Sequence, residues 1–128
     1  MKIEFLKEGS QDCPLIRIFG NDPSSAAQLA LAFRQLANGQ AKEVAIHEIP
    51  GFKPIDGCLL FARLHHEDLG VRALDDGAFE CLLRSEAWER LAELVDPFTG
   101  QLEVVRYQWL DETSEISLLI SNSESGEW

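Results

Sequence analysis

Apolar and polar residues alternate at the start of the chain as they do in β-strands. In residues 2–7, Ile3 and Phe5 stand between charged neighbours, which predicts a half-buried strand. Residues 15–19 form a second short run rich in branched apolar side chains, and the stretch between the two runs has the glycine, serine and proline of a loop. The pattern therefore predicts a first pair of strands.

The spacing of apolar residues changes to that of a helix after Asp22. Asp22 can cap the N-terminus of this helix, Pro23 suits its first turn, and Gly39 can end it in a left-handed conformation. Apolar residues then recur three or four positions apart, which predicts one buried stripe. The members of this stripe are Ala26, Leu29, Ala30, Phe33, Leu36 and Ala37.

Several further strands are predicted in the middle of the chain. Residues 43–49 form the first of them, and residues 58–64 form a nearly continuous apolar run, as in a central strand covered on both faces. Residues 70–84 contain two runs joined through Asp76 and Gly77, a dipeptide that suits the tight turn of a hairpin. We therefore expect the last three of these strands to form a meander.

A second helix is predicted after Ser85, which can cap it, and Pro97 should stop it. Its apolar and acidic residues separate onto two sides, as in a helix at the surface of a domain. The inward side comprises Trp88, Leu91, Leu94, Val95 and Phe98, and the solvent side comprises Glu86, Glu89, Glu93 and Asp96.

The chain ends with a predicted strand pair and a tail. Residues 102–110 and 115–121 have the composition of strands and flank a short polar turn. Residues 122–128 show no periodicity and are expected to be a flexible acidic tail. The whole chain, residues 1–128, is thus predicted to be a single α+β domain, with an antiparallel or mixed sheet and two helices packed on it.

The composition agrees with a domain that folds without metal or disulfides. The chain has 128 residues, of which 45% are hydrophobic and 26% charged, as in an ordinary globular protein. No apolar stretch approaches the roughly 20 residues of a membrane span, and the N-terminus lacks the pattern of a secretory signal. Three widely spaced cysteines do not suggest a disulfide framework. We therefore expect a reducing compartment, most simply the cytoplasm, and no membrane association.

The charge is large and unevenly distributed. The formal net charge is -11, which disfavours binding to nucleic acid or to an anionic membrane, because both are bound chiefly through Lys and Arg. Residues 1–85 hold twelve acids and nine bases, whereas residues 86–128 hold ten acids and only two bases. This excess suits either a solvating surface or a face that attracts a basic partner.

The cluster from His65 to Asp68 raises the question of a metal site. All four of its residues are of ligand types, but consecutive side chains point in different directions, unlike the i and i+2 or i and i+4 spacings of zinc sites on regular structure. We expect a polar turn here, and no metal or cofactor. Cys58 and Cys81 lie in apolar runs and are expected to be buried and unreactive, whereas Cys13 should be accessible.

Three aromatic residues are candidates for contact with a partner. Phe52 lies in the loop 50–57, whose prolines and glycines disfavour regular structure, so its ring is expected to be partly exposed. Tyr107 and Trp109 share one strand face, where core packing and partner binding are both consistent with the pattern.

The favoured function is a non-enzymatic domain that binds or neutralises a basic protein. Acids near the second helix, namely Glu86, Glu89 and Glu93, would steer association, and the aromatic residues would supply contact energy. In size and acidity the chain resembles intracellular proteins that neutralise a basic partner, of which bacterial toxin-immunity proteins are examples. Two alternatives stay open: an enzyme or small-ligand protein with a site between sheet and loops, and a homo-oligomer whose acidic surface only solvates it.

Overall fold

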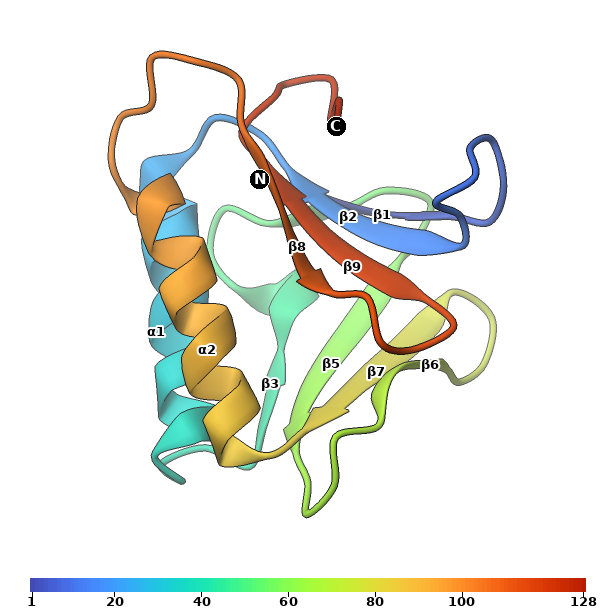
Figure 1. Ribbon diagram of the computed structural model, residues 1–128, viewed down its shortest axis with the longest axis vertical. Helices are drawn as coiled ribbons and strands as arrows, with labels where there is room; N and C mark the ends of the chain where they lie inside the picture. The colour runs from blue at the N-terminus through green and yellow to red at the C-terminus, as the bar shows by residue number, and fades with distance from the viewer.

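The computed structural model describes residues 1–128 as two β-sheets and two helices (Figure 1). The first sheet has the order β4-β1-β2-β9-β8, and the second has the order β3-β5-β7-β6. The strands of the first sheet are β1 (Lys2–Leu6), β2 (Leu15–Phe19), β4 (Lys53–Pro54), β8 (Tyr107–Asp111) and β9 (Ser117–Ser121). Those of the second are β3 (Glu43–Ala45), β5 (Leu59–Leu64), β6 (Gly70–Ala73) and β7 (Ala78–Leu83).

Both sheets are mixed, and both helices pack on them. Parallel pairs join β1 to β4, β2 to β9 and β5 to β7, and the other neighbours are antiparallel. The predicted α+β class is therefore confirmed, although the strands form two sheets rather than one. The chain crosses between the sheets several times: α1 (Pro23–Ala37) leads from the first sheet to the second, β4 returns to the first sheet between β3 and β5, and α2 (Ser85–Val95) leads from β7 back to β8. A hydrophobic cluster of 30 buried residues draws on both sheets and both helices.

The first helix is built as its sequence predicts. Asp22 caps α1, because its carboxylate accepts hydrogen bonds from the Ser25 backbone N–H at 3.1 Å and from the Ser25 hydroxyl at 2.6 Å. These bonds lower the pKa of Asp22 below its ordinary value. At the other end, Gly39 has a φ of +80°, the left-handed conformation that ends helices. The predicted stripe is buried except for Ala37, which is half-buried.

The second helix begins differently from its prediction. Ser85 is the first residue of α2, and Arg84 is the cap residue, with no side-chain capping bond of its own. The carboxylate of Asp68 instead accepts the Arg84 backbone N–H at 2.8 Å. The predicted inward residues are buried except for the half-buried Leu94, and the predicted acids are exposed. The helix ends at Val95, before a 3-10 turn, η2 (Asp96–Thr99), that contains Pro97. No helix has the length and apolar character needed to cross a membrane.

The strand predicted at residues 43–49 is too long. It ends at Ala45 and continues as a 3-10 turn, η1 (Ile46–Glu48). The physical reason is His47, whose Nδ1 accepts the backbone N–H of Leu60 at 3.0 Å. A side chain thus takes the place that the next residue of β3 would occupy beside β5.

The predicted three-strand meander is also wrong. β5 pairs in parallel with β7, and β6 lies at the outer edge of the sheet, although the hairpin turn at Asp76 and Gly77 is confirmed. The expectation that β5 is covered on both faces fails as well. Leu60 and Ala62 are buried, but Phe61 on the other face is half-buried, with its ring against His47 at a centroid distance of 5.0 Å.

The end of the chain differs from its prediction in two places. β8 begins at Tyr107, five residues later than the predicted strand, so residues 102–106 form a loop. Residues 122–128, for which a flexible tail is predicted, bond to the domain at several points. The indole N–H of Trp128 donates to Asp12 at 2.9 Å, and the guanidinium of Arg17 donates to the carbonyl of Gly126 at 3.1 Å.

Candidate functional site

Phe52 is not at the surface, contrary to the expectation from its loop. Its side chain is only 8% exposed and belongs to the hydrophobic core. The reason is that the next two residues, Lys53 and Pro54, pair with β1 as the short strand β4 and draw Phe52 inward. The prediction of partial exposure is therefore wrong.

Tyr107 and Trp109 lie on β8, the edge strand of the first sheet. Tyr107 is 49% exposed, whereas Trp109 is half-buried and lies opposite the fully buried Leu119. The two rings therefore differ in their access to solvent. Of the two, only Tyr107 is exposed over about half of its surface.

Tyr107 is one of three exposed large hydrophobic residues that lie close together in the sequence, an exposure that the sequence pattern does not reveal. Val104 is 70% exposed and Val105 is 66% exposed, and the exposed Arg106 separates them from the start of β8. They look like strand residues in the sequence, but the strand starts after them. We refer to Val104, Val105 and Tyr107 as the 104–107 patch.

The backbone of the 104–107 patch is held in place from β9. Asn122, directly after β9, donates from its side-chain amide to the carbonyl of Val104 at 2.9 Å. Its side-chain oxygen accepts the backbone N–H of Arg106 at 2.6 Å. A single asparagine therefore fixes the shape of this loop, and the exposed valines are presented on an ordered backbone.

The acidic side chains of α2 lie at the surface, with an arginine of α1 close to them. Glu86, Glu89 and Glu93 are all exposed, as predicted. Arg34, on α1, donates to the carboxylate of Asp96 at 2.9 and 2.6 Å. This pairing, together with the nearby charges of Glu89 and Glu93, raises the pKa of Arg34. The acidic side of α2 is thus partly neutralised from the neighbouring helix.

The residues from His65 to Asp68 form a polar turn between β5 and β6, as predicted. The Nδ1 of His65 accepts the backbone N–H of Glu67 at 3.1 Å, and the rings of His65 and His66 stack with centroids 4.2 Å apart. Asp68 bonds to Arg84, as described above. Nowhere in residues 1–128 do three or more His, Cys, Asp or Glu side chains gather in a way that could hold a metal ion.

The cysteines occupy the environments that their sequence context predicts. Cys58 and Cys81 are buried, and Cys13 is half-buried. Burial raises the pKa of the Cys58 thiol to about 11, and it raises that of Cys81 as well. All three thiols are free.

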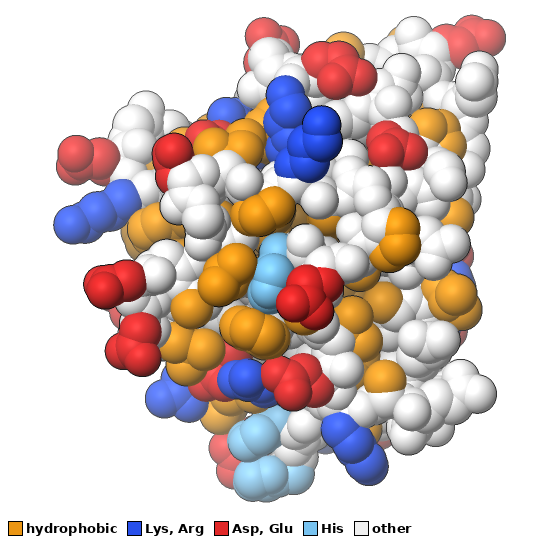
Figure 2. Space-filling model, turned by 180° about the vertical axis from the view of Figure 1, so that it is seen from behind, with side chains coloured by type: hydrophobic (Ala, Val, Ile, Leu, Met, Phe, Trp, Pro, Cys, Tyr) orange, Lys and Arg blue, Asp and Glu red, His pale blue; other side chains and the backbone are white.

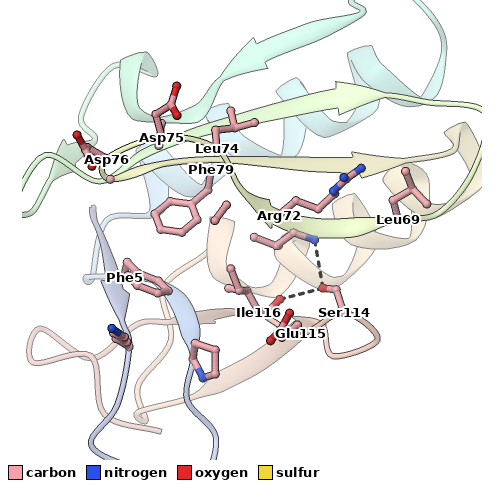
Figure 3. Close-up of a pocket in the computed structure, with 16 residues that line it drawn as sticks. Phe5, Leu69, Arg72, Leu74, Asp75, Asp76, Phe79, Ser114, Glu115 and Ile116 are labelled. Atoms are coloured by element: carbon pink, nitrogen blue, oxygen red, sulfur yellow. Dashed lines mark hydrogen bonds between the residues drawn. The ribbon is translucent and has the colours of Figure 1, made fainter.

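A groove of about 970 Å³ lies between the two sheets. One wall is the β6–β7 hairpin, and the other is formed by Phe5 and Lys7 at the end of β1 and by Pro14 before β2 (Figure 3). Ile116 and Ser114, which precede β9, close one end. The Ser114 hydroxyl accepts the backbone N–H of Val71 at 3.1 Å and donates to the carbonyl of Ile116 at 2.9 Å.

Asp111, on β8 behind this end of the groove, is a buried carboxylate whose bonds come from its own loop. It accepts the Thr113 hydroxyl at 2.7 Å, and it shares the single Ser114 hydroxyl proton, at 2.8 Å, with the Ile116 carbonyl. Gly70 lies against this cluster, because a Cβ atom added there would come within 2.8 Å of the Asp111 carboxylate. These contacts account for Asp111 as a structural residue that shapes the turn.

The remaining large surface, on the side opposite the view of Figure 1, carries charges of both signs among hydrophobic side chains (Figure 2). Arg63 on β5 donates there to Glu43 at 2.8 Å and to Glu80 at 2.5 Å. Arg63 therefore offsets part of the negative charge of Glu43 and Glu80 on this face. The two features that stand out are therefore the 104–107 patch and the groove.

Comparisons of the chain with protein-family models, with curated proteins and with solved structures found no match.

Proposed function

We propose that this domain binds a basic protein partner and that the 104–107 patch is the centre of the contact. The observation that carries the proposal is the concentration of exposed apolar side chains. The five large hydrophobic residues that the fold leaves exposed are Leu31, Leu74, Val104, Val105 and Tyr107. Three of these five lie within four consecutive residues, and exposed apolar groups gathered in this way mark interaction surfaces.

The order of the patch favours binding. Asn122 fixes the backbone on both sides of Val105, so few conformations are lost when a partner docks. Tyr107 adds a ring of the type that is enriched in the energetic centres of interfaces. Trp109, which is half-buried, contributes mainly to holding β8 in place.

The charge distribution supports a basic partner. Glu103 is exposed beside the two valines, and Glu86, Glu89 and Glu93 are exposed on α2, whereas Arg106 is the one exposed base within residues 104–107. Residues 86–128 carry ten acids against two bases, so a basic protein would be attracted to this part of the chain over distances of about 10 Å at 0.1 M salt. Such steering raises the association rate, while the apolar patch slows dissociation. A domain of this kind would act as an inhibitor if the site that it covers on the partner is functional.

We also propose that the domain works in a reducing compartment such as the cytoplasm. All three cysteines are free thiols, and two of them are buried. Disulfides are rare in such compartments, and free buried thiols are the usual state of cysteine there.

The test is affinity capture from the native host with three baits: the wild-type chain, the variant Val104→Ser/Val105→Ser, and the control variant Leu31→Ser. Leu31 is also exposed, but it lies on α1. We expect a basic protein to be retained by wild type and by the control and lost from the double variant. Retention of the same proteins by all three baits would refute the proposal. Light scattering of the isolated domain distinguishes partner binding from self-association. A concentration-dependent dimer that is lost in the double variant would show that the patch binds a second copy of the chain instead of a basic partner.

A further inference from the structure

The groove between the sheets exists because the chain leaves one sheet to join the other. Ile116 forms an isolated antiparallel bridge with Val71 of β6. The next residue, Ser117, already pairs with Leu15 of β2. Beyond the Val71–Ile116 bridge the two sheets therefore separate, and the groove occupies the space between them (Figure 3).

The floor of the groove is aromatic. Phe5 from the first sheet and Phe79 from the second meet there, with ring centroids 4.6 Å apart and the planes tilted by 39°. Leu74, on the hairpin above, is 43% exposed, but Figure 3 shows its side chain pointing away from Phe5, on the same face of the hairpin as Arg72. Phe5 and Phe79 therefore supply the aromatic contact for an apolar side chain that enters the groove.

One edge of the groove is an open strand. The backbone N–H of Leu74 donates to the carbonyl of Ala78, so the backbone polar groups of Leu74 point toward β7. Because backbone groups alternate along an antiparallel strand, the N–H and C=O of Ala73 point the other way. They point in the same direction as the N–H of Val71, which donates to Ser114. Ala73 is exposed, and β6 is the last strand of its sheet, so these groups are free to pair with an added segment.

The rim of the groove is more acidic than basic. Asp75 and Asp76 lie on the hairpin turn, and Glu115 lies on the opposite wall. Lys7 is the one cation from the wall of the first sheet. Arg72 of β6 is paired with Glu80 of β7 in the sheet. Figure 3 shows the Arg72 side chain on the far side of β6 from Ile116. A basic ligand is therefore favoured at this rim.

We propose that the groove binds an extended peptide segment of another protein, in which an apolar side chain is flanked by lysine or arginine. The segment lies beside β6 and pairs with the backbone of Ala73, and its apolar side chain packs on Phe5 and Phe79. Its basic residues lie against Asp75, Asp76 and Glu115. The edge of β6 already bonds to one segment of the chain itself, because Ser114 and Ile116 contact Val71. The peptide would continue this pairing along β6 as an added strand.

This second surface is independent of the 104–107 patch. Figure 1 shows the β6–β7 hairpin and the loop before β8 at opposite sides of the molecule. Loss of binding at one of them therefore leaves the other to be measured separately.

The experiment is a nuclear magnetic resonance titration of the intact domain with a blocked seven-residue peptide that alternates lysine with valine, phenylalanine and valine. Two peptides serve as controls: one with glutamate in place of lysine and one with serine in place of the apolar residues. We expect saturable binding of the first peptide, with shift changes centred on the amides of Ala73 and Leu74, and at least tenfold weaker binding of both controls.

Two variants test the mode of binding. Ala73→Pro removes the free N–H at an edge position that tolerates proline, and Phe5→Ala removes half of the aromatic floor. Each should weaken binding about fivefold or more, as expected for one lost hydrogen bond or one lost apolar contact, while Leu31→Ser has no effect. The proposal is overturned if the lysine peptide does not saturate, if the glutamate peptide binds equally well, or if both groove variants bind as wild type does. It is also overturned if the domain dimerises through these residues without peptide.

Discussion

The guanidinium of Arg34 on α1 donates two hydrogen bonds to the carboxylate of Asp96, which directly follows α2. This pair joins the two helices and places a positive charge close to Glu89 and Glu93. It therefore has two separable effects, one on stability and one on the field of the acidic surface.

Changing Arg34 to Gln should make the acidic surface more attractive to a basic partner. The change removes the charge that offsets Glu89 and Glu93, so the association rate should rise at low salt. Because both members of the pair are partly exposed, the free energy of unfolding should fall by only about 0.5 kcal/mol. Urea titration and stopped-flow association measure the two quantities. The control is Arg84→Gln, which removes a different exposed ion pair and should leave the association rate nearer to that of wild type.

Changing Asp22 to Ala should destabilise the protein by about 1 kcal/mol at neutral pH, because α1 loses its cap. Bonds from Ser25 hold the pKa of Asp22 below 3.8, so the contribution is present above that pH and is lost as pH falls through the folded-state pKa. Thermal unfolding of wild type and variant should therefore differ at pH 7, and the difference should shrink as the pH falls through the lowered folded-state pKa of Asp22. Asp22→Asn, which keeps a capping side chain, should cost less. Equal costs for the two variants at pH 7 would contradict this role of Asp22.

Phe52 and Tyr107, two aromatic candidates from the sequence, should respond oppositely to truncation. Phe52→Ala removes a buried ring and should lower the free energy of unfolding by about 3 kcal/mol or more. Tyr107→Ala removes an exposed ring and should change it by about 0.5 kcal/mol or less. Urea unfolding of both variants measures this contrast. A small loss for Phe52→Ala would mean that its ring is not part of the core.

Only Cys13 should react readily in the native protein. Burial raises the pKa values of Cys58 and Cys81, so few thiolates form at pH 8, and neither side chain is accessible. Mass spectrometry after brief treatment with iodoacetamide should show one modified cysteine in the native state and three in denaturant. Rapid modification of two or more native thiols would show that the region around Cys58 or Cys81 opens.

Local features of the fold could be predicted from the sequence because their causes are local. Asp22, Pro23 and Gly39 mark the ends of α1 by their own chemistry, and Asp76 and Gly77 mark the hairpin turn. The order of β5, β7 and β6 could not be predicted, because strand neighbours depend on which apolar faces meet in the core.

The sites were less predictable than the elements. The exposure of Val104 and Val105 depends on a bond from Asn122, a residue far along the chain that has no strand pattern of its own. The groove unites Phe5, Leu74 and Ile116, which come from three distant segments. The exposed acids of α2 were predictable, since helical spacing alone places Glu86, Glu89 and Glu93 away from the core.

The central claim is that acids in the last third of the chain steer a basic partner onto the 104–107 patch. Its most direct test is the stopped-flow association rate, at low and high salt, of two variants with the same net charge. One is Glu86→Lys/Glu89→Lys/Glu93→Lys, and the other is Glu8→Lys/Glu48→Lys/Glu67→Lys, in which the three exposed acids lie elsewhere. The account predicts that the first variant binds the captured partner much more slowly than the second at low salt, and that the difference shrinks as salt rises. Equal rates for the two variants, or a wild-type rate that does not depend on salt, would contradict it.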